Sequence, residues 1–111
     1  MILMTRLKNA IKKEIPNAEF KLRNININGV KKGCSGFITN EGVTVYVNTE
    51  EPALTNLGLM YRYARNDSDY QGLRNRWVNT GEKDYVLNVI EALKKPLCQI
   101  RELNNDKEKR L

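Results

Sequence analysis

Hydrophobic residues recur at intervals of three and four near the start of the chain. One apolar stripe within residues 2–15 consists of Leu3, Met4, Leu7, Ala10, Ile11 and Ile15. This spacing predicts a short amphipathic helix, since residues three and four apart share one helical face. Pro16 and Asn17 follow it and end the helix. Its other faces carry Arg6, Lys8, Lys12 and Lys13, which we interpret as a solvated surface rather than a phosphate contact.

From Glu19 the apolar period changes from 3.6 to two. Phe20 and Leu22 alternate with basic residues, and the next two isoleucines alternate with asparagines. This alternation predicts a strand, and the change of apolar parity after Leu22 predicts a bulge or break near Arg23–Asn24. Asn28–Gly29 is typical of a two-residue hairpin turn. A second strand is therefore expected to start at Val30.

Two further strands are expected after this hairpin. Asn40-Glu41-Gly42 is a turn signal, and it precedes a segment in which Val43, Val45 and Val47 alternate with Thr44, Tyr46 and Asn48. Residues 59–65 also alternate, with Leu59, Tyr61 and Tyr63 on one parity and Met60, Arg62 and Ala64 on the other. If the aromatic parity faces the core, the arginine parity faces solvent. Packing then explains the tyrosines as well as base stacking does.

A second amphipathic helix is expected near the end of the chain. Thr80 is a candidate N-cap, and Val86, Val89, Ile90 and Leu93 form an apolar stripe within Glu82–Lys95. Pro96 predicts a kink or the first position of another helix. Together these patterns predict one α+β domain over residues 1–103, with a three- or four-stranded antiparallel meander between an N-terminal amphipathic helix and a C-terminal helix kinked or broken at Pro96. Residues 104–111 are expected to be a frayed charged tail.

The charge of the chain is unevenly distributed. The 111 residues carry a net charge of +6, and residues 1–32 alone contribute eight basic and two acidic side chains. Residues 33–59 contain three acidic and no basic residues, and residues 60–81 contain four arginines and two aspartates. Such a chain attracts polyanions if its two basic parts meet in space. Solubility alone is the other explanation of the positive charge.

The residue inventory argues against several kinds of chemistry. Histidine is absent, and Cys34 and Cys98 are too far apart for a CxxC pair, so we expect free thiols, no metal site and no cofactor. Asp67, Asp69 and the residues after them imitate a calcium loop, but Val78 stands where the closing glutamate belongs. We interpret these aspartates as caps of backbone amides. The sequence therefore predicts a protein that is not an enzyme.

Membrane association is also not expected from the sequence. No run of eighteen apolar residues occurs, and the first residues lack the apolar core of a signal peptide. We therefore expect a cytoplasmic protein without a membrane partner.

Arginines and aromatic residues alternate between Met60 and Val78. Arginine suits planar, multidonor contacts with phosphates or carboxylates, and aromatic rings stack on bases or fill protein hot spots. An internal network with nearby acidic residues is the structural alternative. The candidate binding residues are the arginines Arg62, Arg65, Arg74 and Arg76, the aromatic residues Tyr61, Tyr63 and Trp77, and the peripheral lysines Lys31 and Lys32.

Two hypotheses follow for the function. The first is a small basic accessory protein that binds nucleic acid, with single-stranded DNA or RNA favoured because the aromatic residues Tyr61, Tyr63, Tyr70 or Trp77 need unstacked bases. The second is a phage- or mobile-element-type protein that binds a larger host or element-encoded protein, as an inhibitor or subunit of a nucleic-acid enzyme. The sequence does not indicate an oligomeric state.

Overall fold

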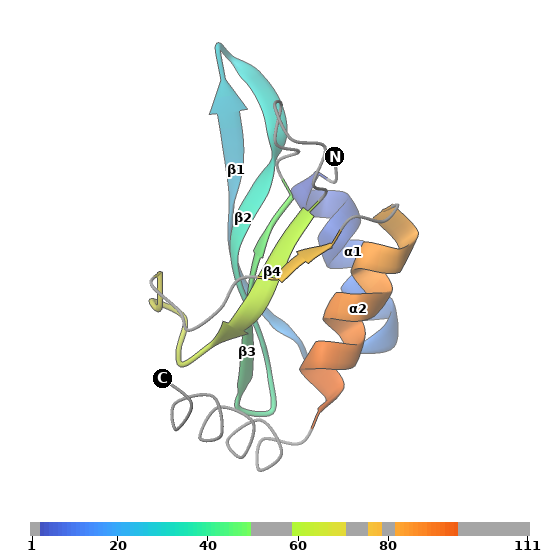
Figure 1. The fold of residues 1–111 in the computed structure, drawn as a ribbon. Helices are drawn as coiled ribbons and strands as arrows, with labels where there is room; N and C mark the ends of the chain where they lie inside the picture. Colours follow the sequence, from blue (N-terminus) through green and yellow to red (C-terminus); the bar gives the residue numbers. More distant parts are fainter. Residues whose placement is uncertain (1–2, 50–58, 71–75, 79–81, 96–111) are drawn as a thin grey trace.

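In the part of the chain that the structure describes, two helices pack on one face of an antiparallel sheet (Figure 1). The computed structural model describes residues 3–49, 59–70, 76–78 and 82–95. The elements follow in the order α1 (Met4–Glu14), β1 (Glu19–Ile27), β2 (Val30–Asn40), β3 (Val43–Asn48), β4 (Leu59–Ala64), β5 (Arg76–Val78) and α2 (Glu82–Lys94). The α+β meander expected from the sequence is confirmed.

The sheet has the strand order β1-β2-β3-β4-β5, so each strand pairs with its neighbour in sequence. The first four strands match the expected ones, and β5 is an added strand in a segment that we expected only to lead into the second helix. The predicted bulge is present: the register shifts between Asn24 and Asn26, where Ile25 lies opposite both Lys32 and Gly33. The predicted kink at Pro96 and the tail 104–111 lie outside the described residues.

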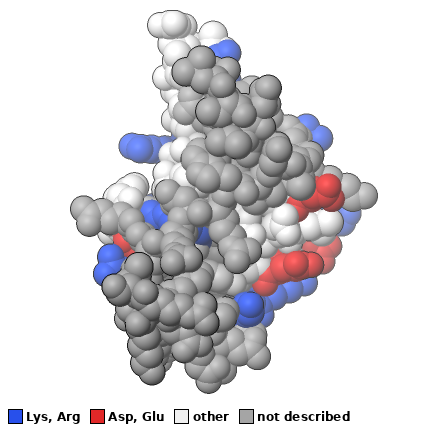
Figure 2. All heavy atoms as spheres, in the orientation of Figure 1, with Lys and Arg blue, Asp and Glu red and all other residues white. Residues whose placement is uncertain are grey.

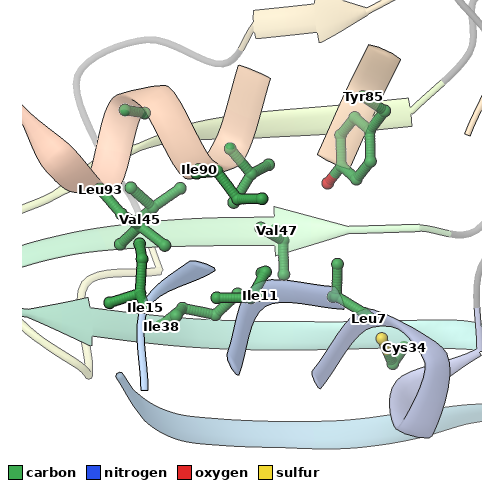
Figure 3. Packing of buried hydrophobic residues seen from close by; sticks show 12 residues of the cluster. Leu7, Ile11, Ile15, Cys34, Ile38, Val45, Val47, Tyr85, Ile90 and Leu93 are labelled. Atoms are coloured by element: carbon green, nitrogen blue, oxygen red, sulfur yellow. The ribbon is translucent and has the colours of Figure 1, made fainter. Parts of the chain in front are cut away.

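The main core lies between the sheet and the two helices (Figure 3). Helix α1 contributes Leu7 and Ile11, and its C-cap residue Ile15 is also buried, as the apolar stripe predicted. Strands β2 and β3 contribute Cys34, Ile38, Val45 and Val47, and helix α2 contributes Tyr85, Val89, Ile90, Ala92 and Leu93. Full burial of these aliphatic side chains stabilises the fold by about 1.5–3 kcal/mol each.

Tyr85 is a core residue that the sequence pattern did not indicate. Its side chain is fully buried, and its hydroxyl donates a 2.8 Å hydrogen bond to the carbonyl of Met60. The ring also lies edge-on to Tyr61, with 6.1 Å between the ring centroids. Tyr85 therefore ties helix α2 to strand β4 and satisfies its own polar group inside the core.

The hairpin of β1 and β2 extends beyond the rest of the sheet (Figure 1). Strand β3 pairs with β2 from Ser35 onward, and one further backbone bond joins Thr49 to Cys34. Residues 26–32 are all exposed. Asn28 and Gly29 form the tip with φ angles of 53° and 79°, which is the left-handed conformation that a tight hairpin turn requires.

Candidate functional site

Two tyrosines of the candidate site pack against the helices. The hydroxyl of Tyr63 donates to the carbonyl of Ala92 at 3.1 Å, and Tyr61 packs against the core beside Tyr85. Both side chains lie on the parity of β4 that faces α2, as the alternation of residues 59–65 indicated. Their rings help to hold the helix on the sheet, and in this arrangement they are not presented to a ligand on the opposite face.

The opposite face of the sheet, which we call the outer face, carries Phe37 of β2, Tyr46 of β3 and Arg62 of β4. Tyr46 and Arg62 lie opposite each other in the register, and the guanidinium carbon of Arg62 lies 4.6 Å from the Tyr46 ring centroid. Phe37 is adjacent to Tyr46, with 5.3 Å between ring centroids. These contacts make a stacked arginine and aromatic layer across three strands.

A short loop after β4 folds back over this layer. Tyr70 of the loop lies edge-on to Phe37 and Tyr46, at centroid distances of 5.2 and 6.5 Å. Tyr70 is nevertheless 61% exposed, whereas Phe37 beneath it is only 1% exposed. Among the described aromatic side chains of the loop and the outer face, Tyr70 is therefore the one that offers most of its surface to a ligand.

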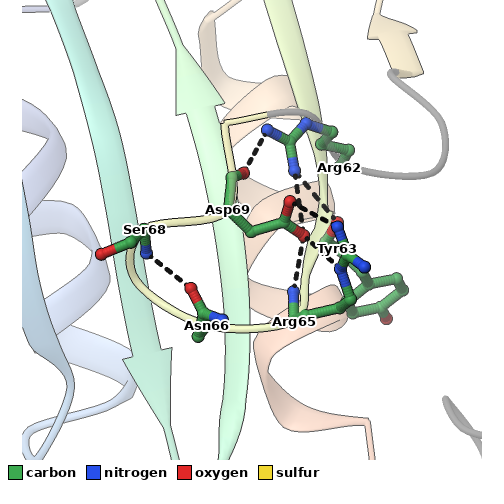
Figure 4. Close-up of polar contacts among 6 residues, drawn as sticks. All are labelled: Arg62, Tyr63, Arg65, Asn66, Ser68 and Asp69. Atoms are coloured by element: carbon green, nitrogen blue, oxygen red, sulfur yellow. Dashed lines mark hydrogen bonds and ion pairs between the residues drawn. The ribbon is translucent and has the colours of Figure 1, made fainter.

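Asp69 holds the loop in place (Figure 4). Its carboxylate accepts a 2.9 Å hydrogen bond from the backbone N–H of Arg65 and longer bonds from the Arg65 guanidinium. Arg62 donates to the backbone carbonyl of Asp69 at 2.6 Å, and its guanidinium lies 3.9 Å from the Asp69 carboxylate. Asn66 caps the N–H of Ser68 in the same turn. The aspartate thus caps a backbone amide, as interpreted from the sequence.

The two arginines of this network differ in exposure. Only 3% of the Arg62 side chain is exposed, so its charge serves internal contacts with Asp69 and Tyr46. The Arg65 side chain is 67% exposed, although Asp69 orients it. Arg62 therefore positions the loop, and Arg65 directs a guanidinium toward solvent.

The remaining candidates divide between described and undescribed parts of the chain. Lys31 and Lys32 lie exposed near the hairpin tip. Arg76 and Trp77 lie in β5, where their backbones pair with Tyr61 and Met60. Arg74 lies outside the described residues. Arg65 therefore lies in the loop over the outer face, whereas Lys31 and Lys32 lie apart from it, on the extended end of the β1–β2 hairpin.

The basic N-terminal third meets the loop at Lys21. The ammonium of Lys21 lies 3.1 Å from the carbonyl of Asp67 and 4.0 Å from its carboxylate. Arg23, two residues along β1, lies on the same face and is also exposed. The basic N-terminal segment thus contacts the loop that carries Arg65, with Asp67 offsetting part of the positive charge of Lys21.

Basic side chains also lie on the helical side of β1. The ammonium groups of Lys8 and Lys12 lie 5.9 and 5.6 Å from the centroid of the Phe20 ring. Strand β1 is at the edge of the sheet, so positive charges flank this edge on both faces. In Figure 2, basic side chains project from the hairpin, and acidic and basic side chains lie next to each other over the side where the helices lie.

The described residues provide little reactive chemistry. Cys34 is a free, fully buried thiol, and burial raises its pKa, which keeps it protonated and unreactive. No group of three or more Cys, Asp or Glu side chains in the described part of the chain could hold a metal ion. Within the same residues, no helix is long and apolar enough to cross a membrane.

The fold and its surface define a small α+β protein with a basic edge strand. A loop held by Asp69 covers the layer of Phe37, Tyr46 and Arg62 on the outer face. No known protein family matches the chain, and no curated protein or solved structure shows significant similarity to it.

Proposed function

We propose that this chain is a small, non-enzymatic accessory protein that binds nucleic acid by contacting phosphates. The observation that supports this proposal is the set of basic side chains along edge strand β1, namely Lys21 and Arg23 on one face and Lys8 and Lys12 beside Phe20 on the other. Lys21 also contacts the loop that carries Arg65. Several cations on one edge raise the local concentration of a polyanion and supply phosphate contacts.

A structural explanation of the same lysines must be separated from binding. Lysines on an exposed edge strand also prevent sheets from pairing edge to edge. That role needs charge but no particular ligand. Binding to phosphates, in contrast, releases counterions and therefore gives an affinity that falls steeply with salt. Salt dependence is thus the property that separates the two explanations.

The proposal assigns different tasks to the candidate residues. Lys21, Arg23 and Arg65 contact phosphates, and Tyr70 stacks on an unpaired base. Arg62 holds the loop that presents Arg65 and Tyr70. Arg74, Arg76 and Trp77 remain proposed contacts on the sequence argument. The expected preference for single strands now depends mainly on Tyr70 and Trp77, because Tyr61 and Tyr63 pack against the helices.

Fluorescence anisotropy with labelled single-stranded DNA, duplex DNA and RNA tests this proposal at two salt concentrations. We expect salt-sensitive binding, and we expect the triple variant Lys21→Ala, Arg23→Ala, Arg65→Ala to reduce the slope of log K against log salt by about 2–3. The control variant Lys94→Ala, Lys95→Ala changes two exposed lysines at the end of α2, near Asn40, where β2 ends far from the hairpin tip. This variant should keep the wild-type slope. Absence of binding to all three ligands would refute the proposal.

A protein partner is the second candidate. Tyr70 and Arg65 are both exposed on one loop, and tyrosine and arginine are enriched among residues that dominate binding energy in protein interfaces. A pulldown from lysate after nuclease treatment tests this candidate. A complex that survives nuclease and is lost in the Tyr70→Ala variant would favour an inhibitor or subunit over a nucleic-acid-binding protein.

A further inference from the structure

The β1–β2 hairpin has an extension that contributes little to the main core. Residues 26–32 are exposed on both faces of the two-stranded ribbon, and within the described residues β3 reaches β2 only as far as Cys34. At the tip, Ile27 and Val30 lie opposite each other and remain 43% and 54% exposed. Such a ribbon gains little stability from burial, so a contact with a partner is a physical reason for its length.

The charge of the hairpin indicates the chemistry of that partner. No acidic residue occurs between Glu19 and Glu41, whereas this stretch contains Lys21, Arg23, Lys31 and Lys32. The cross-strand pairs place Asn26 opposite Lys31 on one face of the ribbon, and Ile27 opposite Val30 on the other. One face thus combines an amide with an ammonium group, which are side chains that read base edges through hydrogen bonds.

The dimensions of the ribbon fit a groove of duplex DNA. Past the Asn24–Cys34 pair, β1 continues for three residues and β2 for four, because the bulge adds one residue to β2. A strand rises about 3.3 Å per residue, so the projection is about 10–13 Å long. The two backbones lie about 5 Å apart. A major groove is about 12 Å wide and 8.5 Å deep, and it admits a two-stranded ribbon. The bulge at Lys32–Gly33 adds right-handed twist near the base of the ribbon.

From these observations we propose that the ribbon formed by residues 24–33 inserts into the major groove of double-stranded DNA, with Asn26 and Lys31 toward the base edges. Lys32 and Arg23 then lie at the level of the phosphates that border the groove. This inference rests on the proposed nucleic-acid-binding function, and it assigns duplex to the ribbon, in contrast to Tyr70 and Trp77, which are assigned to unpaired bases. Contacts of β1 and the loop with phosphates do not require the ribbon.

The test compares the full-length protein with two ribbon variants. The point variant Asn26→Ala, Lys31→Ala keeps the hairpin length, and the charge-matched control is Lys95→Ala. A shortened variant lacks Asn26, Ile27, Val30 and Lys31, and it retains the Asn28–Gly29 turn. Circular dichroism melting shows whether each variant is folded. Anisotropy with a labelled duplex and with its single strand measures the affinities at one salt concentration.

We expect the ribbon variants to lose duplex affinity by on the order of tenfold, with a much smaller change for the single strand and for the Lys95 control. Dimethyl sulfate probing of the saturated duplex should show protection of guanine N7, which faces the major groove, and the point variant should lose this protection. Wild-type N7 reactivity that stays unchanged at saturation would overturn the inference, even if the shortened variant is unfolded.

The failure of the inference can be distinguished from the failure of the proposed function. If the wild-type protein binds no nucleic acid, both are wrong. If it binds and the folded ribbon variants bind duplex equally well, only the ribbon inference is wrong. A nuclease-resistant complex with a protein that requires Asn26 and Lys31 would also overturn it, because the ribbon would then serve a protein interface.

Discussion

Replacing Asp69 by asparagine should destabilise the protein strongly, although the residue lies in a surface loop. The substitution keeps the shape of the side chain and removes its charge. Only 4% of the Asp69 side chain is exposed, and the equally buried Arg62 guanidinium lies 3.9 Å away. The change therefore leaves a buried cation without its carboxylate.

The expected magnitude follows from the contacts that remain. Breaking a buried ion pair by removing one partner costs about 3–5 kcal/mol. Arg62 would keep its 2.6 Å bond to the Asp69 carbonyl and its stacking on Tyr46, which lowers the cost. We expect a loss of about 3 kcal/mol in the free energy of unfolding, which corresponds to a fall in Tm of more than about 10 °C.

Chemical denaturation followed by far-ultraviolet circular dichroism measures this loss. The control is Arg65→Ala, since Arg65 contacts the same carboxylate from an exposed position and should cost less than about 1 kcal/mol. The double variant Arg62→Met, Asp69→Asn removes both charges and should be more stable than Asp69→Asn alone. If Asp69→Asn costs no more than Arg65→Ala, the buried pair does not hold the loop, and the reasoning is wrong.

Three further predictions concern the sheet and the core. Gly36→Ala should destabilise the protein by several kcal/mol or prevent folding, because an added Cβ would clash with the Lys21 carbonyl. In Gly29→Ala the added Cβ meets no atom within 4 Å, so this variant should lose only about 1 kcal/mol through backbone strain. Thermal melts of both variants check this. Tyr85→Phe should lower the free energy of unfolding by about 1–3 kcal/mol, because the carbonyl of Met60 loses its buried donor, and urea denaturation measures the change. Burial raises the pKa of Cys34 above its ordinary 9.0 and that of Tyr85 above its ordinary 10.0, so the folded state binds more protons than the unfolded state at alkaline pH. The contribution of these two groups to stability should thus be constant below about pH 8 and fall as pH rises through 9 and 10, and a melting temperature that stays constant from pH 8 to pH 11 would contradict this.

The periodicity of apolar residues was sufficient to predict most of the fold. The change from a spacing of three and four to a spacing of two separates α1 from β1, and the parity flip after Leu22 located the bulge within about two residues. These features depend on neighbouring residues only. The alternation in β4 put Tyr61 and Tyr63 on one side of the strand but left open whether that side faces the core, and the structure shows that it faces the helices.

Alternation could not predict the environment of Arg62. Its position on the side of β4 opposite the tyrosines indicated an exposed side chain. The loop after β4 nevertheless covers Arg62, because Asp69 of that loop contacts the guanidinium. That contact depends on the path of the loop, which no period in the sequence encodes. The short strand β5 was missed because three residues are too few to show alternation. Tyr85 was missed because the stripe was drawn from aliphatic residues, whereas a tyrosine can be buried when its hydroxyl has an acceptor.

The order of the elements has a consequence for synthesis on the ribosome. Strands β1 to β3 are complete at Asn48, but the face that carries Ile38, Val45 and Val47 is closed only when α2 has been made. The end of that helix, Lys94, lies 46 residues after Asn48, and their synthesis takes roughly 2–9 seconds at 5–20 residues per second. During this interval each nascent chain exposes an apolar sheet, and that sheet is a binding site for chaperones and a point of aggregation between neighbouring ribosomes.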